Sequence, residues 1–553
     1  MVPMPVPSFL RRAPVALAFG TSGLRGLVTD ITDLEAYINV KGALRYLAAI
    51  GDAPASGPVI LGGDLRPSTA RILVACARAV RDVGGTVVHA GRLPTPALML
   101  ACLARRCAGV MVTGSHIPFD RNGIKVNRAV GEVLKSDEPG ILREVAAVRA
   151  EEYARSAEES AFDADGMRKA DETLAPVDAA IARAYLDRYV SAMPGAPLRG
   201  LRVLFHQHSS VGRELVPEIL RELGAEVVTA GRSETFVAID TESIGDDQVA
   251  ELTALCVVAE AAHGAMDAVV STDGDSDRPL MLAVRRGVDG APSLRFLPGD
   301  LLGLVVAERL GADAVAVPVS TNDAVAMRLA ELGVRLRTTR IGSPWVVAAL
   351  AALVSEGAQR VMGWEANGGF LLGSAVSLGA AVLEPLPTRD AVLPLVVNLL
   401  VAAERRSSLD AVWSALPQRF GRAGLVDGVA PSVTQAVMAR LVPAGAATEV
   451  RFAADGSVSD AARAHDWHTS RSVMARFFTE ADGFGTVLRV NALDGVRMTF
   501  DGGDVAHVRA SGNAPQLRIY ANAATQSRAD AIVAAGLRPV DGILARMAAE
   551  LGG

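Results

Sequence analysis

The segment most informative about architecture reads Val59-Ile60-Leu61-Gly62-Gly63-Asp64-Leu65-Arg66, an apolar run that ends in small and charged residues. The run predicts a buried strand followed by a loop. Residues 68–82 then have helical periodicity, and after a pair of glycines a second apolar run ends in Ala90-Gly91-Arg92. Strand, helix, glycine and strand in this order predict a βαβ unit.

The same unit occurs twice more in the chain. The second copy covers residues 201–232 and ends in Ala230-Gly231-Arg232, and the third covers residues 314–342. A recurring unit predicts three related α/β domains whose βαβ crossovers are right-handed. After each copy a further apolar strand ends in a polar loop. Because ligands of α/β sheets bind beyond strand ends, we expect these loops to form walls of one shared cleft.

The first polar loop is Thr113-Gly114-Ser115-His116-Ile117-Pro118, which directly follows the apolar run 108–112. Ser115 is a candidate nucleophile or phosphate carrier, with His116 beside it and Lys125 ten residues further on. Lys125 could act as a general acid/base if burial and neighbouring cations lower its pKa. The alternatives are a serine turn that caps a helix, a hydrogen-bonded turn histidine and a solvated surface lysine.

The second loop is Asp273-Gly274-Asp275-Ser276-Asp277-Arg278. If the loop is extended, its alternating aspartates point the same way and can converge on one hard cation. Oxygen ligands in this number favour Mg²⁺ or Ca²⁺ over zinc. An EF-hand would require a glutamate at the twelfth position, where this chain has Val284. The alternative is a solvated acidic turn.

Three further loops carry polar groups. Glu365 and Asn367, in Gly363-Trp364-Glu365-Ala366-Asn367-Gly368-Gly369, suit sugar hydroxyls, with a helix-capping loop as the alternative. Arg509-Ala510-Ser511-Gly512-Asn513 suits a phosphate dianion, or is a surface turn. Arg25, among the glycines of residues 19–26, could contact phosphate, although a structural glycine turn is the simpler interpretation.

Length and composition limit the possible classes of protein. A chain of 553 residues should hold three or four domains, and its net charge of -6 from interspersed charges argues against binding nucleic acid or membrane surfaces. The longest apolar run, residues 391–403, contains Pro394 and Asn398 and is too short to span a bilayer. The four cysteines lack zinc-type spacing and sit in apolar segments, which predicts reduced thiols in a cytoplasmic protein.

The final part of the chain departs from the repeat. Alternating apolar and polar residues at 486–490 and 496–500, followed by a terminal helix, predict a smaller α+β domain. The charged, alanine-rich residues 151–173 indicate a linker or exposed helix. The predicted domain limits are 1–165 for the serine loop, 166–300 for the metal loop, 301–424 for the sugar loop and 425–553 for the phosphate loop.

Together and in this order, the four loops resemble motifs of the α-D-phosphohexomutase superfamily. The serine loop resembles T-A-S-H-N-P, the aspartate loop D-G-D-G-D-R, the glutamate loop G-E-x-S-G and the final loop R-x-S-G-T-E-P. The resemblance covers nearly the whole chain and implies four domains around a central cleft, the first three sharing a fold. It implies a phosphohexomutase that interconverts hexose 6-phosphate and hexose 1-phosphate, most simply of mannose and/or glucose. The implied route uses a phosphoserine and a hexose 1,6-bisphosphate, with Mg²⁺ as cofactor.

The resemblance also implies roles for individual residues. Ser115 carries the phosphoryl group, Lys125 is the acid/base, and Arg25, His116 and Arg278 surround the reacting phosphate. Magnesium lies among Ser115, Asp273, Asp275 and Asp277. The sugar is held by Glu365 and Asn367, and its unreacting phosphate by Arg340, Ser343, Arg509, Ser511, Gly512 and Asn513.

The chain departs from the family motifs at several positions. Gly114 and Ile117 replace alanine and asparagine in the serine loop, and Ser276 replaces a glycine in the metal loop. Asn367-Gly368-Gly369 replaces S-G-H, so a substrate-contacting histidine of some members is absent, and Asn513-Ala514 replaces T-E. These changes bear on substrate choice more than on chemistry.

Three alternative functions remain open at this point. The first is a phosphoglucosamine mutase. The second is a phosphatase of the haloacid-dehalogenase kind, in which an aspartate would be the nucleophile, and the third is a non-catalytic sugar-phosphate sensor. The expected partner is a hexose phosphate, with no nucleic acid or membrane, and the expected state is a monomer or homodimer.

Overall fold

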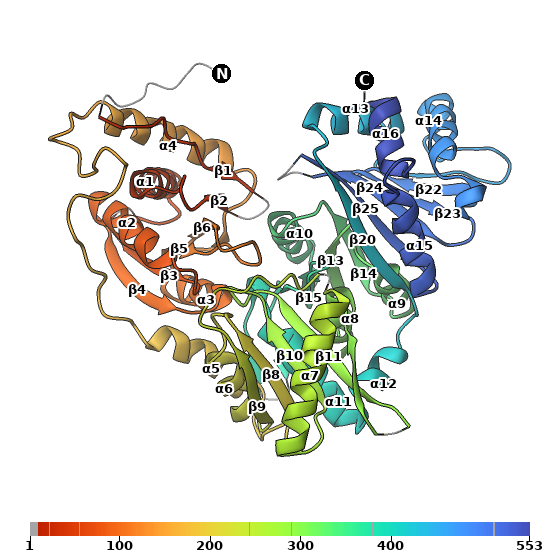
Figure 1. Cartoon of the computed structure of the whole chain (residues 1–553), viewed down its shortest axis with the longest axis horizontal. Coiled ribbons are helices and arrows are strands. Elements are labelled where there is room, and N and C mark those ends of the chain that lie inside the picture. The colour runs from red at the N-terminus through yellow and green to blue at the C-terminus, as the bar shows by residue number, and fades with distance from the viewer. Residues whose placement is uncertain are drawn as a thin grey trace. The chain divides into compact units, whose positions relative to one another are not determined.

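The three repeated segments fold into three mixed sheets of the same local design in the computed structural model of the chain (Figure 1). The structure describes residues 9–20, 23–54, 56–242, 244–288, 290–378, 381–511 and 515–552. In each sheet the first strand of the repeat has parallel neighbours, and the later apolar strand leads through its polar loop into an antiparallel strand.

The first domain contains a seven-stranded sheet. Its strands, in sheet order, are β1 (Ala18–Phe19), β2 (Leu24–Leu27), β6 (Arg121–Arg128), β5 (Ala108–Val112), β3 (Pro58–Gly63) and β4 (Thr86–Arg92), with β7 (Gly131–Glu132) paired to β6. The helices are α1 (Asp33–Ala49), α2 (Thr69–Asp82), α3 (Thr95–Arg105) and α4 (Glu138–Tyr153). The predicted strand, helix and strand of the first repeat are confirmed as β3, α2 and β4.

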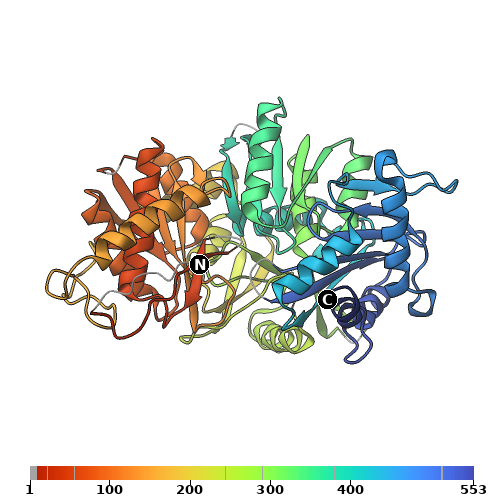
Figure 2. The ribbon, with the colours of Figure 1, turned by 90° about the horizontal axis from the view of Figure 1, so that it is seen from above.

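Helices cover both faces of the first sheet (Figure 1, Figure 2), and alternate residues of β5 pack against the two layers. Val110 and Val112 belong to the core that includes α1, α2 and α4. On the other face, a Cβ placed on Gly109 would lie 2.4 Å from Cys102 Sγ of α3. A strand buried on both faces gives an uninterrupted apolar run, which is the pattern seen before Ser115.

The second and third domains repeat this arrangement. The second sheet has the order β12 (Pro292–Phe296), β11 (Pro279–Arg286), β10 (Ala268–Thr272), β8 (Arg202–His208) and β9 (Glu226–Arg232), with helices α5 (Ala180–Ala192), α6 (Leu215–Glu222) and α7 (Asp246–His263). The third contains β13 (Ala314–Pro318), β15 (Val361–Trp364), β16 (Phe370–Leu372) and β19 (Leu386–Asp390), beside the hairpin β17 (Val376–Leu378) and β18 (Ala381–Leu383). Its helices are α8 (Gly299–Arg309), α10 (Ser343–Ser355), α11 (Val392–Arg405) and α12 (Leu409–Ser414).

The three polar loops follow equivalent strands. β5, β10 and β15 each lie between a parallel partner and an antiparallel one, and the polar loop is the connection to the antiparallel strand. The repeat read from the sequence therefore places these loops correctly.

The C-terminal domain is an antiparallel sheet with helices, as predicted. Its strands, in order, are β20 (Phe420–Asp427), β25 (Gln516–Ala523), β24 (Val505–Ala510), β23 (Val496–Phe500), β22 (Val487–Asn491) and β21 (Glu449–Arg451). The helices are α13 (Pro431–Leu441), α14 (Ala464–Phe477), α15 (Gln526–Leu537) and α16 (Ile543–Leu551). β20 begins at Phe420, ahead of the predicted limit at 425, and the domain limits as a set stay predictions.

The chain forms two compact units, residues up to 316 with 342–413, and residues 317–341 with 414–553. The second unit thus combines the C-terminal domain with α9 (Asp323–Glu331) and β14 (Arg335–Thr339). Within it, Arg419 and Arg497 both pair with Asp323 at the start of α9. These ion pairs explain why α9 belongs with the C-terminal sheet.

The segment expected to be a linker or exposed helix is an irregular connection from α4 to α5, attached to the first domain. α4 ends at Tyr153, and the residues after it run along the first domain without forming a helix. Phe162 is buried in the core of that domain, and Arg168 Nε donates to Asp33 at 3.0 Å. One aromatic side chain in an otherwise polar segment is enough to fasten it to the domain, which composition alone does not reveal.

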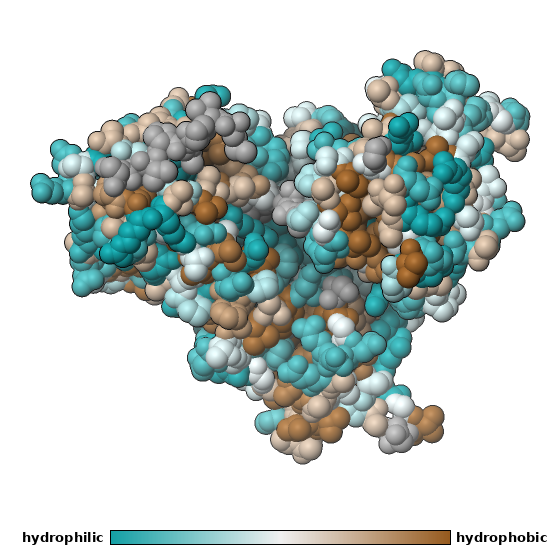
Figure 3. Space-filling model, turned by 45° about the horizontal axis from the view of Figure 1, so that its top comes forward, coloured by the Kyte–Doolittle hydropathy of each residue, from teal (hydrophilic) through white to brown (hydrophobic). Residues whose placement is uncertain are grey.

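On the face shown in Figure 3, hydrophilic and hydrophobic residues are interspersed. Among the described residues, no helix combines the length and the apolar character needed to cross a membrane.

Candidate active site

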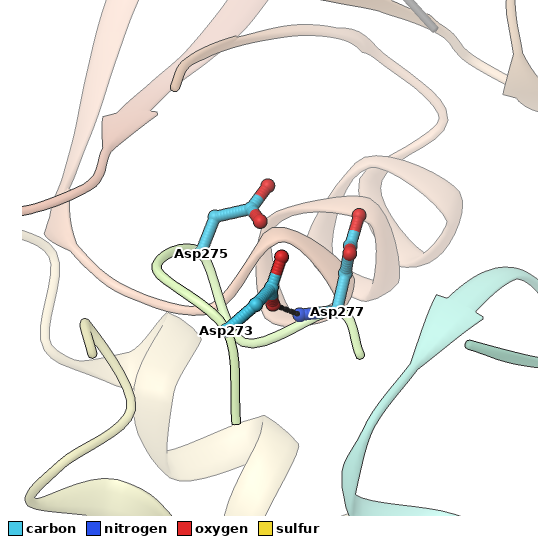
Figure 4. Close-up of side chains that lie close together, drawn as sticks. All are labelled: Asp273, Asp275 and Asp277. Atoms are coloured by element: carbon cyan, nitrogen blue, oxygen red, sulfur yellow. Dashed lines mark hydrogen bonds between the residues drawn. The ribbon is translucent and has the colours of Figure 1, made fainter. Parts of the chain in front are cut away.

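The loop between β10 and β11 brings three aspartates together. Asp273, Asp275 and Asp277 are fully buried, and one carboxylate oxygen from each lies within 4.8 Å of the others. Their carboxylates project from the same side of the loop (Figure 4). Asp273 Oδ1 accepts the backbone N–H groups of Asp277 and Arg278 at 3.1 and 3.2 Å, which curls the loop around its first carboxylate. The predicted convergence is confirmed.

Ser276 stabilises the turn of this loop. Its φ of +56° is left-handed, a conformation that glycine adopts most easily, and glycine is what the family motif has there. The Ser276 hydroxyl bonds Ser210 and Thr272 at 2.9 and 2.8 Å and accepts the N–H of Gly212 at 2.9 Å. These contacts tie the aspartate loop to the loop after β8 and offset the cost of a side chain in this turn.

The serine loop faces the aspartate loop. Ser115, directly after β5, is fully buried and has a left-handed φ of +54°. Its Oγ donates to Asp273 Oδ2 at 2.5 Å and lies 3.3 Å from His116 Nδ1. Non-glycine residues in this conformation are held there by their surroundings, and such positions cluster at functional sites.

Lys125 joins the same cluster from β6. Its Nζ lies 2.7 Å from Asp275 Oδ2 and 2.9 Å from Asp277 Oδ2. Burial acts to lower the pKa of Lys125, but the attraction of Asp275 and Asp277 outweighs it and raises the pKa above its ordinary value. The condition for acid/base action inferred from the sequence, a lowered pKa, is not met here, because carboxylates rather than cations are the nearest charges; the acid/base role of Lys125 stays a prediction.

Cationic groups also lie close to Ser115, and one of them reaches the aspartates: Arg278 Nε is 3.9 Å from Asp273 Oδ2 and 3.7 Å from Asp277 Oδ1. Burial and repulsion from Arg278 and Arg389 lower the pKa of Arg25, on β2, to about 10. Arg278, burial and Arg25 together lower the pKa of His116 well below its usual range, so His116 is neutral at physiological pH. Arginines gathered near His116 and Ser115 suit an anion such as a phosphoryl group, because guanidinium groups bond phosphate oxygens well.

Arg66 holds the serine loop in shape. It is fully buried, and its guanidinium donates to four backbone carbonyls, those of Ser115, Ile117, Pro118 and Arg121, at 2.6–3.0 Å. Its Nε donates to Asp64 at 3.1 Å, and its guanidinium lies 3.9 Å from the ring centroid of Phe236. Sequence reasoning gave Arg66 no role; an arginine directly after a buried strand was the available signal.

Gly114 makes room for this arginine. A Cβ on Gly114 would lie 2.6 Å from Arg66 Cζ and Nε. The glycine that replaces alanine in the serine motif is therefore matched to the position of Arg66 in this chain.

The sugar loop follows β15. Glu365 and Asn367 are buried, with 6% of each residue exposed. Asn367 Oδ1 accepts the backbone N–H of Gly369 at 3.0 Å, and its carbonyl accepts the hydroxyl of Thr241 at 2.9 Å. Glu365 Oε2 accepts from Arg389 Nη1 at 3.0 Å. A hydrogen bond within the loop thus fixes its shape, and Arg389 orients Glu365. The sequence did not indicate this role of Arg389.

The predicted phosphate loop lies in the second unit. Arg509, at the end of β24, donates from Nε to Asp494 Oδ1 at 2.8 Å, and Asp494 Oδ2 accepts the N–H of Ile341 at 3.0 Å. Asp494 therefore places the backbone after Arg340 next to Arg509. Ser511 follows Arg509 within the described chain, whereas Gly512 and Asn513 lie outside the described residues.

Ser343 contacts a carboxylate of the first domain, and its predicted role toward phosphate stays a prediction. It is fully buried at the start of α10, and its hydroxyl donates to Glu132 Oε2 at 2.9 Å. Glu132 also accepts the hydroxyl of Thr388 at 2.6 Å. Ser343 thus connects the third domain to β7 of the first.

The aspartate loop fits a divalent cation. Asp275 Oδ1 and Asp277 Oδ1 are buried and have no hydrogen-bond partner within the described part of the chain. Unpaired carboxylate oxygens without water are costly, and a hard cation would satisfy them. Ser115 Oγ is hydrogen-bonded to Asp273, so a phosphate oxygen on Ser115 could join the three aspartates as a ligand of the cation.

Comparison with known families agrees with this geometry. Models of the phosphoglucomutase/phosphomannomutase α/β/α domains I, II and III match residues 16–152, 183–287 and 298–420, and the model of the C-terminal domain matches residues 446–537. The chain belongs to the phosphoglucomutase/phosphomannomutase family. This membership confirms the resemblance carried by the four loops, and with it the prediction of a phosphohexomutase.

Individual relatives extend the comparison. The chain is 36% identical to a phosphomannomutase of Sinorhizobium fredii over 94% of its length and 98% of the relative. It is 34% identical to a phosphomannomutase of Salmonella muenchen over 96% of each chain. A Burkholderia thailandensis phosphoglucomutase/phosphomannomutase family protein of known structure, 18% identical, superposes with a TM-score of 0.61 over 96% of this chain and 98% of that one, which shows a shared fold.

Proposed function

We propose that the chain is a phosphomannomutase and/or phosphoglucomutase that moves a phosphoryl group between the 1- and 6-hydroxyls of a hexose by way of Ser115. The observation that carries this proposal is the buried Ser115 Oγ, which lies 2.5 Å from Asp273 in a triad of aspartates. The names of the two relatives at 34% and 36% identity favour mannose phosphates.

The proposed reaction has two balanced transfers. Phosphorylated Ser115 gives its phosphoryl group to the free sugar hydroxyl: the bond from phosphorus to Ser115 Oγ breaks, and a bond to the sugar oxygen forms. The proton of the sugar hydroxyl passes by way of neutral Lys125 to the departing Ser115 Oγ, so the serine hydroxyl is restored and the sugar becomes a hexose 1,6-bisphosphate. After this intermediate reorients, Ser115 Oγ takes up its other phosphoryl group, and the serine proton passes back by way of Lys125 to the sugar oxygen that is released. Such transfers depend mainly on positioning and on stabilising charge.

The residues around Ser115 have roles that follow from their positions. Arg25 and Arg278 would offset the charge of the phosphoryl group, and neutral His116, whose Nδ1 lies 3.3 Å from Ser115 Oγ, would contact it. Asp273, Asp275, Asp277 and phosphorylated Ser115 would hold Mg²⁺, which would act as a Lewis acid on the transferring group. Proton transfer by Lys125 requires its partners Asp275 and Asp277 to be neutralised, and a cation bound by the same carboxylates would do this.

The remaining predicted contacts serve binding. Glu365 and Asn367 would hold sugar hydroxyls. Arg509 and the backbone after Arg340, both fixed by Asp494, would hold the unreacting phosphate, with Ser511, Gly512 and Asn513. The buried bond of Ser343 to Glu132 makes a positioning role more consistent with the geometry than direct phosphate contact.

The four cysteines bear on location. Cys76, Cys102, Cys107 and Cys256 are free and buried, which supports the proposed cytoplasmic location. A monomeric or homodimeric state is likewise proposed from the sequence.

The deciding experiment measures kcat/KM for mannose 1-phosphate and glucose 1-phosphate with Mg²⁺ and catalytic hexose 1,6-bisphosphate. We expect turnover of at least one substrate, with mannose preferred. Turnover of glucosamine phosphate alone would identify a phosphoglucosamine mutase. Release of inorganic phosphate without isomerisation would identify a phosphatase, and binding without turnover would identify a sensor.

A further inference from the structure

Arg389 connects the aspartate loop with the sugar loop. It lies on β19 and is 3% exposed. Its Nε and Nη2 donate to Asp277 Oδ2 at 3.0 and 2.8 Å, and its Nη1 donates to Glu365 Oε2 at 3.0 Å. One buried guanidinium therefore spans two carboxylates from different domains, for which the proposed roles are metal binding and sugar binding.

The sugar loop is shaped around this arginine. A Cβ placed on Gly369 would lie 2.6–3.0 Å from Arg389 Cδ, Cγ and Cβ. Real Cβ atoms do not approach other carbons so closely, so the arginine and a side chain at position 369 exclude each other. Arg389 can therefore occupy its position only because residue 369 is a glycine.

Arg389 also competes for the metal-binding carboxylates. Asp277 Oδ2 already accepts from Arg389 and from Lys125, which leaves Oδ1 as its unpaired oxygen. A fixed positive charge in hydrogen-bond contact with a ligand oxygen opposes the approach of a second cation. The same charge faces Glu365, where it orients the carboxylate and leaves Oε1 for a sugar hydroxyl.

We propose that Arg389 is a positioning residue that links sugar binding to metal binding, holding Glu365 toward the sugar while weakening the hold of the aspartates on a divalent cation. The sugar half of this inference rests on the proposed function; the metal half does not. The guanidinium is suited to the task because its planar fork can bond two carboxylates at once, which an ammonium cannot do with the same geometry.

The test separates charge from geometry with three variants. Arg389→Met removes both, Arg389→Lys keeps the charge, and Gly369→Ala displaces the arginine without altering it. Calorimetric titration with Mg²⁺, in the absence of sugar, measures metal affinity, and mutase kinetics at saturating Mg²⁺ measure KM and kcat. Arg309→Met, which breaks the exposed pair with Glu404, is the matched control.

We expect Arg389→Met to bind Mg²⁺ about tenfold more tightly than the wild type, and a tenfold change is about 1.4 kcal/mol. The same variant should raise the KM for hexose phosphate at least about tenfold, while kcat changes less than about threefold. Arg389→Lys should keep the metal affinity and still raise KM, Gly369→Ala should raise KM, and the control should change neither. A merely structural arginine would weaken metal binding when removed.

The inference and the proposed function fail in different ways. Metal affinity that is unchanged or weaker in Arg389→Met, or a KM that this variant leaves unchanged, overturns the inference. If Arg389→Met does not fold, the KM values of Arg389→Lys and Gly369→Ala test the proposed role in sugar binding. A Mg²⁺ affinity that differs between Arg389→Lys and the wild type overturns the proposed effect of the charge on metal binding. A wild-type protein without turnover on any hexose phosphate overturns the function, while calorimetry still tests Arg389.

Discussion

Ser115 Oγ donates a 2.5 Å hydrogen bond to Asp273 Oδ2, although 158 positions separate the two residues and they belong to different domains. The contact aims the serine hydroxyl at the aspartate triad, so a phosphoryl group on Ser115 would be carried to the metal-binding oxygens. Because both residues are completely buried, the arrangement depends on how the two loops pack and not on a mobile side chain.

Replacing this hydroxyl should stop the reaction and leave the fold in place. Ser115→Ala removes the atom that carries the phosphoryl group, so we expect kcat to fall by at least about a thousandfold while the thermal unfolding midpoint changes by only a few degrees. A coupled isomerase assay and a melting curve measure the two effects. Ser191→Ala, on the exposed side of α5, is the control; normal turnover in Ser115→Ala would contradict the phosphoserine scheme.

Arg66 should matter for stability as well as for activity. Arg66→Met leaves the carboxylate of Asp64 buried without its cation and four carbonyls of the serine loop without their donor. Breaking a buried pair by removing one partner typically costs about 3–5 kcal/mol. Urea unfolding should show a loss of this order together with a large loss of turnover. Arg183→Met, which breaks an exposed pair with Asp187, should change neither quantity, and equal behaviour of the two variants would refute the scaffold role.

Gly114→Ala tests the fit between the serine loop and Arg66. The added Cβ would lie 2.6 Å from the guanidinium, so either the loop or Arg66 must move. Overpacking of this kind costs about 1–3 kcal/mol, and we expect a lower kcat because Ser115 is the next residue. Gly502→Ala, where an added Cβ meets nothing within 4 Å, controls for the substitution itself. An unchanged kcat in Gly114→Ala would show that the loop tolerates the displacement.

Metal removal should abolish activity reversibly. Chelation should stop turnover and added Mg²⁺ should restore it, because the buried Asp275 and Asp277 oxygens provide the cation site. Asp275→Asn removes one ligand charge and should weaken Mg²⁺ binding at least about tenfold in calorimetry. Asp187→Asn, on the surface, should bind as the wild type does. Turnover that survives exhaustive chelation would exclude a metal-dependent reaction.

The sequence predicted the parts of this site that belong to local motifs and missed the parts that depend on contacts between segments far apart in the chain. Ser115 and the three aspartates follow apolar strands, so their place at strand ends could be read from the chain. Arg66 and Arg389 carry no local motif. Their importance comes from what lies opposite them, four loop carbonyls in one case and Asp277 with Glu365 in the other. The direction of the pKa shift of Lys125 could not be read from the chain for the same reason, since its nearest charges come from a distant loop.

His507 should give the second unit a characteristic pH dependence of stability. Burial lowers the pKa of this histidine to about 4, while its Nε2 contacts the carbonyl of Asp494 at 2.6 Å. The unfolded chain, with a histidine pKa of about 6.5, binds the proton more readily than the folded one. Stability is therefore fully present above pH of about 6.5 and falls as the pH drops toward 4, by up to about 3 kcal/mol.

Urea unfolding of His507→Asn between pH 7 and 4.5 should show a shallower decline in stability than that of the wild type. The stability of His465→Asn, a change on an exposed helix surface, should fall with pH as that of the wild type does. If the stability of His507→Asn fell as steeply as that of the wild type, His507 would not contribute to the pH dependence.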